Sequence, residues 1–465
     1  MAEFRLLIPA SHEPERRHAA TLVFDDVLGV DVNVVTSSVT VPTITDGELS
    51  LQVADGFFAH DRLDSIEARR NASRRRRVDE PMRTNAQDLP WLFDDDSGSQ
   101  NLVIDERGAR LTVDVFGAVF FLATMFEEVD APAVDRHGRF LAINSTAVRG
   151  EFLRRPVAEE HVDLLWMAMR SVWPRLERRR RAFEAVLTFD VDNPYAYQNR
   201  RLRSVARSVV GRGVIRGRPR SALAMARGWA DVRRHGVDRD PWNTFDVLMT
   251  GTESLGVQGM FHLIADPDPA GRNPDAVYRL DDPAVVSLID SVRRRGHLLG
   301  VHGSYESHLS VDRLRREVET VRELAADFGQ PSRPLHGRQH YLRWDAAASP
   351  ATQAAAGLDV DSTVGFAERA GFRAGMCRPF HAYDHRSRRT LPLMVRPLIV
   401  MDRTLVDAGY ENLARESAVD LLEELAATCR RHQGEYVVLW HNDSLHDDRL
   451  GPLWNDLLAV IGSGA

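Results

Sequence analysis

The stretch from Phe183 to Pro194 reads FEAVLTFDVDNP and decides the expected fold. Its apolar run, Ala185 to Phe189, predicts a buried strand, and two carboxylates, Asp190 and Asp192, follow where that strand ends. Carboxylates two residues apart on a strand point to the same side, where their repulsion is tolerable only beside a cation. A metal ligand next to a general base is one interpretation, and an ordinary Asx turn or cap is the other.

Short apolar runs separated by helical segments continue from here to the C-terminus, which indicates βα units and a parallel sheet. The helix expected over Val311 to Phe328 carries leucine and valine at helical spacing, with Ser310 as N-cap, and should pack outside the sheet. Eight candidate strands suggest a barrel. They are Ala185–Phe189, Gly259–Ile264, His297–Val301, Pro334–Gly337, Gly357–Val360, Gly371–Met376, Leu398–Val400 and Tyr436–Leu439.

The chain of 465 residues is too long for one core, because single domains stop growing at roughly 250 to 300 residues. We expect a smaller N-terminal α/β domain over residues 1–180 and a barrel over residues 183–465, with the basic run Arg175 to Arg181 near the boundary. The elements expected in the N-terminal domain are a strand over Val32–Val41, a polar loop over Arg69–Asp96, a buried helix over Val113–Met125 and a second helix within Glu151–Trp173.

Composition limits the partners of this protein. The 60 basic and 67 acidic side chains give a net charge of -7, so no overall field attracts nucleic acid. Every basic residue is an arginine, and the absence of lysine excludes a Schiff-base or lysine general-base mechanism. A basic helical insertion at about residues 197–240 could contact an anionic glycan or the inner leaflet of a membrane, or could be a solvated surface.

The cysteines and the apolar runs indicate where the protein is found. Cys377 and Cys429 lie far apart without CxxC spacing, so neither a disulfide framework nor a thiolate zinc site is expected. The first residues contain too short an apolar run for a signal peptide, and no run approaches the roughly 18 residues of a membrane span. We therefore expect a cytoplasmic protein without a membrane span.

Other residues able to bind a metal or transfer a proton also follow predicted strands. The C-terminal strand ends of a βα barrel converge on one face, so these residues should meet although they span over half the chain. Each alone has an ordinary explanation, as a strand-capping histidine or a structural ion pair. They are His302 in GVHGSYESHL, Arg338 and His340 in GRQHYLRW, Asp361 in LDVDSTVGF and His441 in YVVLWHND.

The residue types suggest how such a site would work. Arg338 beside Asp190 would keep that carboxylate ionised and ready to deprotonate water. An aspartate, Asp359 or Asp361, bonded to one imidazole nitrogen of His441 would raise the basicity of that histidine. His441 could then protonate a departing amine.

The order of these motifs resembles the NodB-homology polysaccharide deacetylases, carbohydrate esterase family four, in a divergent branch that covers roughly Phe183 to Leu458. TFDVD is similar to the first family motif, and the resemblance implies Asp190 as the base and Asp192 as a metal ligand. The His302 loop is similar to the second motif. Arg338, Asp361 and His441 match the third, fourth and fifth motifs, which implies catalytic roles for all three and a distorted (β/α) barrel.

The second motif departs from the family pattern. In the family two histidines four residues apart bind the metal, whereas the position four residues after His302 is Glu306. The third ligand is therefore open among His340, His308 and Glu306, and the spacing of His340 from Arg338 favours His340. The resemblance implies a divalent ion, zinc in the first place, held by Asp192, His302 and His340.

The implied activity is the hydrolytic removal of N-acetyl groups from an amino-sugar glycan or a glycan precursor, which could be lipid-linked at the inner leaflet. Two alternatives are a catalytically inactive glycan-binding or polysaccharide-biosynthesis accessory protein on the same barrel, and a metal-independent amidase. The N-terminal half, with FGAVFF at Phe116 to Phe121 and LRRP at Leu153 to Pro156, resembles an uncharacterised domain often fused ahead of such deacetylases.

Overall fold

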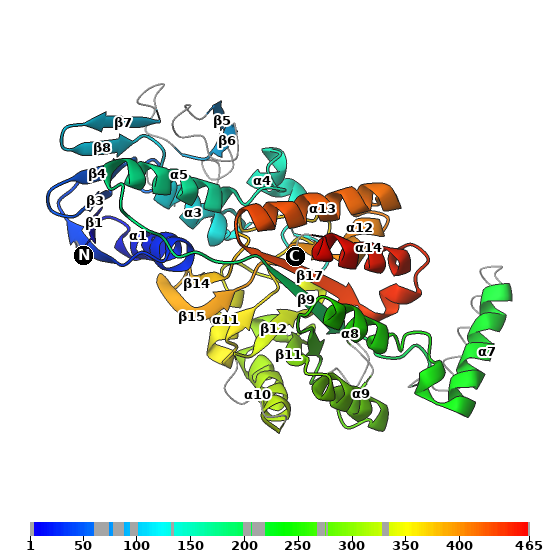
Figure 1. Ribbon diagram of the computed structural model, residues 1–465. Coiled ribbons are helices and arrows are strands. Elements are labelled where there is room, and N and C mark those ends of the chain that lie inside the picture. Colours follow the sequence, from blue (N-terminus) through cyan, green and yellow to red (C-terminus); the bar gives the residue numbers. More distant parts are fainter. Residues whose placement is uncertain are drawn as a thin grey trace. The chain divides into compact units, whose positions relative to one another are not determined.

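The computed structural model in Figure 1 divides into two compact units. Unit 1 comprises Met1–Glu184, Tyr341–Val400 and Glu424–Val437, and unit 2 comprises Ala185–His340, Met401–Glu423 and Val438–Ala465. The predicted domain boundary between residues 180 and 183 stays a prediction. The structure describes residues 4–59, 74–77, 88–93, 101–131, 134–198, 206, 219–266, 275, 278–327 and 334–463.

Unit 1 contains a mixed sheet with the strand order β2-β1-β3-β4-β8-β7. Strand β1 is parallel to β2 and antiparallel to β3, and β4 is parallel to β8. The strand predicted over Val32–Val41 is present but ends earlier. The bounds are β1 Phe4–Pro9, β2 Val32–Ser37, β3 Thr43–Thr45, β4 Ser50–Val53, β7 Leu102–Asp105 and β8 Gly108–Leu111.

Part of the predicted loop Arg69–Asp96 is a strand pair, which corrects that prediction. Strand β5, Arg74–Arg77, is antiparallel to β6, Asp88–Trp91. A run of four arginines has no hydrophobic alternation, so the sequence pattern gave no sign of a strand here. The rest of the loop lies outside the described residues.

Helices α1 and α5 contact strands of the six-stranded sheet, and both also contact α3 (Figure 1). The predicted helix over Val113–Met125 is confirmed as α3, which is buried along its whole length and is capped by Asp114 through a hydrogen bond from the Gly117 amide. The ring of Phe57 lies 4.8 Å from that of Phe93 in the core. The helix bounds are α1 Glu13–Ala20, η1 (a π-helix) Thr21–Leu28, α3 Val115–Ala123, α4 Thr146–Arg149, α5 Val157–Val172 and α11 Ser349–Ala356.

The remaining strands of unit 1 differ from the prediction. Strands β14, Phe380–Asp384, and β15, Arg389–Val395, form an antiparallel hairpin that was not predicted, and β13, Val360–Asp361, is parallel to β15. The strand predicted over Gly371–Met376 is wrong. Gly371 and Gly375 have φ values of +141° and +63°, which interrupt an extended backbone with turns.

Unit 2 is built around β9, Glu184–Val191, which is buried from Ala185 onward. It lies in a run of parallel strands in the order β12-β11-β10-β9, and β17 lies on its other side. The hydroxyl of Thr188 donates to the carbonyl of Val438 on β17 at 2.8 Å. The other strands are β10 Met260–Leu263, β11 Leu298–Gly303, β12 His336–Gln339, β16 Val400–Met401 and β17 Glu435–His441.

Helices connect the parallel strands of unit 2, which confirms the predicted βα units. The helix predicted over Val311–Phe328 is α10, Val311–Asp327. Both units are mixed α/β structures, and closure of the strands into a barrel stays a prediction. The other helices are α7 Pro219–His235, α8 Phe245–Ser254, α9 Pro283–Arg294, α12 Asp402–Val406, α13 Arg415–Arg431, which continues into unit 1, and α14 Leu450–Gly462.

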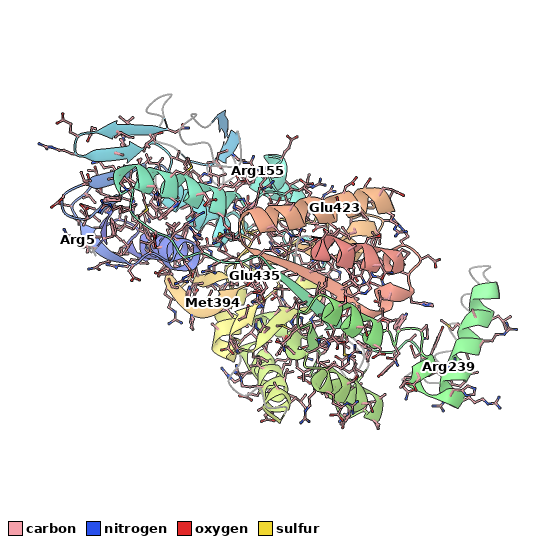
Figure 2. The ribbon with its side chains drawn as sticks, viewed as in Figure 1. Arg5, Arg155, Arg239, Met394, Glu423 and Glu435 are labelled. Carbon is pink, nitrogen blue, oxygen red and sulfur yellow. The ribbon has the colours of Figure 1, made fainter. Side chains whose placement is uncertain are left out.

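The basic insertion is described only in part, because residues 199–205 and 207–218 lie outside the described residues. Its helix α7 presents Arg227, Arg233 and Arg234 as exposed side chains, and Arg239, labelled in Figure 2, follows the helix. Within the described parts of the chain, none of the helices combines the length and the apolar character needed to cross a bilayer.

A buried ion pair should determine much of the stability of unit 1. Arg16 and Asp55 form two hydrogen bonds of 3.0 and 2.7 Å, and both side chains are at most 3% exposed. We expect Asp55→Ala to destabilise the protein by about 3 to 5 kcal/mol in urea unfolding, because it leaves the Arg16 charge buried without its partner.

The control is Glu13→Ala. Glu13 lies in α1, the helix that carries Arg16, and this substitution breaks an exposed pair with Arg17. This change should have little effect on the free energy of unfolding, because solvent screens exposed ion pairs. Equal changes in the free energy of unfolding for the two substitutions would contradict the stabilising role of the Arg16–Asp55 pair.

Candidate active site

Asp190 is held from two sides. It is 2% exposed, and its Oδ1 accepts hydrogen bonds from Nη1 of Arg338 at 2.9 Å and from Nδ1 of His262 at 2.8 Å. Burial raises the pKa of this carboxyl, but the Arg338 guanidinium and the nearby imidazoles outweigh burial and hold the pKa well below its usual range. Asp190 is therefore ionised at neutral pH, and Arg338 lies beside it as the sequence predicts.

His262 is a site residue that sequence reasoning missed. It lies on β10, in register with Asp190 on β9 and with Gly300 on β11. Burial lowers the pKa of its imidazole to about 4 despite the hydrogen bond to Asp190, so the ring is neutral and carries its proton on Nδ1. A Cβ on Gly300 would lie 2.3 Å from Cδ2 of His262, so glycine is needed there. The available signal was a histidine inside the apolar run MFHLI.

Asp192 lies two residues after Asp190 and is only partly buried. Its Oδ1 is 3.0 Å from Nε2 of His302 and 3.6 Å from Nε2 of His340. One ligand atom from each of these three residues lies within 4.8 Å of the other two. The structure thus brings together the three residues that the sequence proposed as metal ligands.

The hydrogen bonds of the two histidines determine which nitrogen faces Asp192. Nδ1 of His302 lies 2.9 Å from the carbonyl oxygen of Arg338, and Nδ1 of His340 lies 3.0 Å from Oδ1 of Asp275. Both Nδ1 atoms donate to these oxygens, so the Nε2 of each ring, in the neutral form, offers a lone pair toward Asp192. Two nitrogens and one carboxylate oxygen are a ligand set that suits Zn²⁺.

Two further observations fit a cation at this place. Oδ1 of Asp192 is buried and has no hydrogen-bond partner of acceptable geometry within the described residues. Burial lowers the pKa of His340, but the carboxylates of Asp192 and Asp275 outweigh burial and raise it to about 9. The group therefore attracts positive charge, which a proton or a divalent ion can supply.

His441 ends β17 and has its own carboxylate partner. Its Nδ1 lies 2.9 Å from Oδ1 of Asp402, and its backbone amide donates to Oδ2 of Asp402 at 2.7 Å. Nε2 of His441 lies 3.8 Å from Oδ2 of Asp192. Burial lowers the pKa of His441, but Asp402 and then Asp192 raise it to about 10, so the imidazole is protonated at neutral pH.

The partner of His441 differs from the expectation. The sequence suggested Asp359 or Asp361, and the structure has Asp402, the first residue of helix α12, directly after the two-residue strand β16. Asp361 lies on β13 in unit 1, where its carboxylate accepts hydrogen bonds from the side chain of Gln353 and from Thr363. A catalytic role of Asp361 stays a prediction.

The structure distinguishes the three candidates for the third ligand. Glu306 is exposed, and among the described residues the candidate metal group contains neither Glu306 nor His308. His340 lies near His302 because it follows β12, which pairs with the β11 strand that carries His302. Of the three candidates, His340 is thus the one that the structure groups with Asp192 and His302.

Comparison with known proteins adds a family match at the N-terminus. Residues 5–174 match a family of unknown function, DUF7033. No curated protein matches this chain.

Two solved structures resemble the chain remotely. One, from Mycobacterium smegmatis and assigned as a polysaccharide deacetylase, is 17% identical over 60% of this chain and 84% of its own, with a TM-score of 0.37. The other, from Bordetella bronchiseptica and assigned as a polysaccharide deacetylase involved in O-antigen biosynthesis, is 15% identical over 47% of this chain and 74% of its own, with a TM-score of 0.25. Neither likeness bears on the chemistry of the site.

The pair of His441 and Asp402 should make stability depend on pH. The pKa of His441 rises from 6.5 to about 10 on folding, so its stabilising contribution is complete below pH 6.5 and is lost as the pH rises through 10. In metal-free protein at pH 6, Asp402→Asn should lower the free energy of unfolding by roughly 2 to 4 kcal/mol.

The measurement is urea unfolding with a chelator present, at pH 6 and pH 10, for the wild type, Asp402→Asn and the exposed control Asp246→Asn. The difference between the wild type and Asp402→Asn should shrink at pH 10, while the control should match the wild type at both values. A difference that is the same at both pH values would refute the ion pair.

Proposed function

We propose that this protein is a metal-dependent hydrolase that removes N-acetyl groups from an amino-sugar glycan or a glycan precursor. The observation that carries the proposal is the convergence of Asp192, His302 and His340 between a buried ionised carboxylate, Asp190, and a protonated imidazole, His441. A ligand set flanked by one base and one acid is the arrangement that amide hydrolysis requires.

The ion would be held by Asp192 and by Nε2 of both His302 and His340. When bound, a divalent ion such as Zn²⁺ acidifies water and polarises an amide carbonyl. The ligand set fits this ion by the types of its atoms and by the fixed tautomers of the two imidazoles.

Asp190 would accept the proton of the attacking water. The hydrogen bonds from Arg338 and His262 both end on Oδ1, which leaves Oδ2 to receive that proton. The same bonds fix the carboxylate in one orientation, so no reorganisation is needed when the water is activated.

His441 would protonate the departing amine. Its Nδ1 proton is committed to Asp402, so Nε2 is the nitrogen that donates. Because Asp402 keeps the ring protonated at neutral pH, His441 starts the reaction as an acid, while Asp190 starts it as a base. The two groups therefore differ in role as well as in position.

The choice of substrate rests on the resemblance of the motifs to polysaccharide deacetylases. An N-acetylated glycan, or a lipid-linked sugar precursor met in the cytoplasm near the inner leaflet, is the substrate class that we propose. The exposed arginines of α7 support an anionic partner because they form a basic surface on a chain of net negative charge.

The first test concerns the metal. Isothermal titration of metal-free protein with Zn²⁺ should give one ion per chain, and Asp192→Ala or His302→Ala should abolish binding because each removes one of three ligands. His308→Ala, in the same loop as His302, should bind like the wild type. A wild type that binds no zinc, cobalt or nickel would favour the inactive glycan-binding alternative.

The second test concerns the base. With N-acetylglucosamine oligomers as substrate, Asp190→Asn should lower the rate of acetate release about 10² to 10⁴-fold and should still bind Zn²⁺, because the amide cannot accept the proton. Asp246→Asn, at an 88% exposed side chain, should keep the wild-type rate. Activity that survives a chelator would instead indicate a metal-independent amidase.

A further inference from the structure

Asp275 lies beside the candidate metal centre and belongs to none of the motifs in the sequence. Its side chain is 1% exposed. Oδ1 of Asp275 accepts a hydrogen bond from the backbone amide of Tyr305 at 2.7 Å and another from Nδ1 of His340 at 3.0 Å. Oδ2 is also buried and has no partner of hydrogen-bonding geometry within the described residues. A buried carboxylate is expensive, so this placement calls for a compensating positive charge nearby.

His340 needs this contact more than His302 does. Nδ1 of His302 is fixed by a backbone carbonyl on the adjacent strand, which the sheet itself holds in place. The chain after His340 leaves β12 through Tyr341 and Leu342, with φ values of +62° and +53°, a conformation that is uncommon for residues other than glycine. The orientation of the His340 ring therefore depends on a side chain, that of Asp275.

Asp275 also connects the supports of two ligands. Tyr305, whose amide it binds, lies three residues after His302 in the loop that leaves β11. His340 lies at the end of β12. Oδ1 of Asp275 thus holds both the loop that follows His302 and the ring of His340.

We propose that Asp275 is a positioning residue for the metal centre. It keeps the His340 proton on Nδ1, directs Nε2 toward Asp192 and increases the electron density on that nitrogen. The affinity of the site for a divalent ion then depends on a residue that does not touch the ion. This inference rests on the proposed function, because it requires that Asp192, His302 and His340 bind a metal.

The contribution of such a carboxylate can be large. Partners that orient metal-binding histidines commonly change metal affinity 10- to 100-fold when they are replaced. An asparagine at position 275 keeps an oxygen for both hydrogen bonds but removes the charge, whereas an alanine removes both. The two substitutions therefore separate the hydrogen bonds from the charge.

The experiment is competition titration of the full-length protein with Zn²⁺ against a chromophoric chelator, together with the visible absorption spectrum of the Co²⁺-loaded protein. Asp275→Ala should weaken Zn²⁺ binding 10- to 100-fold and change the Co²⁺ spectrum. Asp275→Asn should weaken binding by more than about twofold but by less than Asp275→Ala, with a spectrum close to that of the wild type.

The matched controls are Asp282→Ala and Asp282→Asn. Asp282 lies on the same connection between β10 and α9, where its carboxylate caps α9 by accepting from the amide of Ala284. These variants should bind Zn²⁺ like the wild type. If Asp275→Ala does not fold, as judged by circular dichroism, Asp275→Asn carries the test through the spectrum and the affinity.

The outcomes separate the inference from the proposed function. A wild type that binds Zn²⁺ and Asp275 variants whose affinities lie within twofold of it would overturn the role of Asp275 and leave the metal site intact. A wild type that binds no divalent ion would overturn both. Equal losses in the Asp275 and Asp282 variants would show a general effect of the connection and would also overturn the role of Asp275.

Discussion

Two carboxylates at the end of one buried strand are the constraint on which the site depends. Asp190 and Asp192 lie on the same side of the chain because side chains alternate along a strand, and their repulsion would destabilise the fold if nothing offset it. Unit 2 offsets the two charges differently. Asp190 is neutralised permanently by Arg338, whereas Asp192 faces the Nε2 atoms of two imidazoles, where a proton on His340 or a bound cation can offset its charge.

This asymmetry separates the roles of two chemically identical groups. A carboxylate with a permanent arginine partner stays ionised without a metal, which is the form that a base requires. A carboxylate that faces two imidazoles needs a proton on one of them or a cation, and the raised pKa of His340 reflects that need. Arg338 on β12 and His340 directly after it thus give the two carboxylates the different surroundings that we propose for a base and for a metal ligand.

The sequence predicted what depends on periodicity and strand ends. Asp190, His302, Arg338 and His441 all follow predicted strands, and each lies among the last residues of the observed strand, which extends beyond the predicted one. The partners of these residues could not be predicted, because Asp275 and Asp402 lie outside long periodic segments and a partner is chosen by tertiary contact. The false strand over Gly371–Met376 arose from a short apolar run that two glycines with positive φ turn into loops.

The position of His340, on a different segment from His302, has a physical consequence for the geometry of the candidate metal site. Two histidines four residues apart would place both ligands in one loop after β11, so a single loop would determine the geometry. Here His302 lies on β11, and His340 directly follows β12, which pairs with β11 in register up to Gln339, so the sheet brings the two residues close together. Only the direction of the His340 ring is then left to the loops, and Asp275 supplies that direction. The distance between His302 and His340 thus depends on the sheet, whereas the orientation of the His340 ring depends on the buried carboxylate of Asp275.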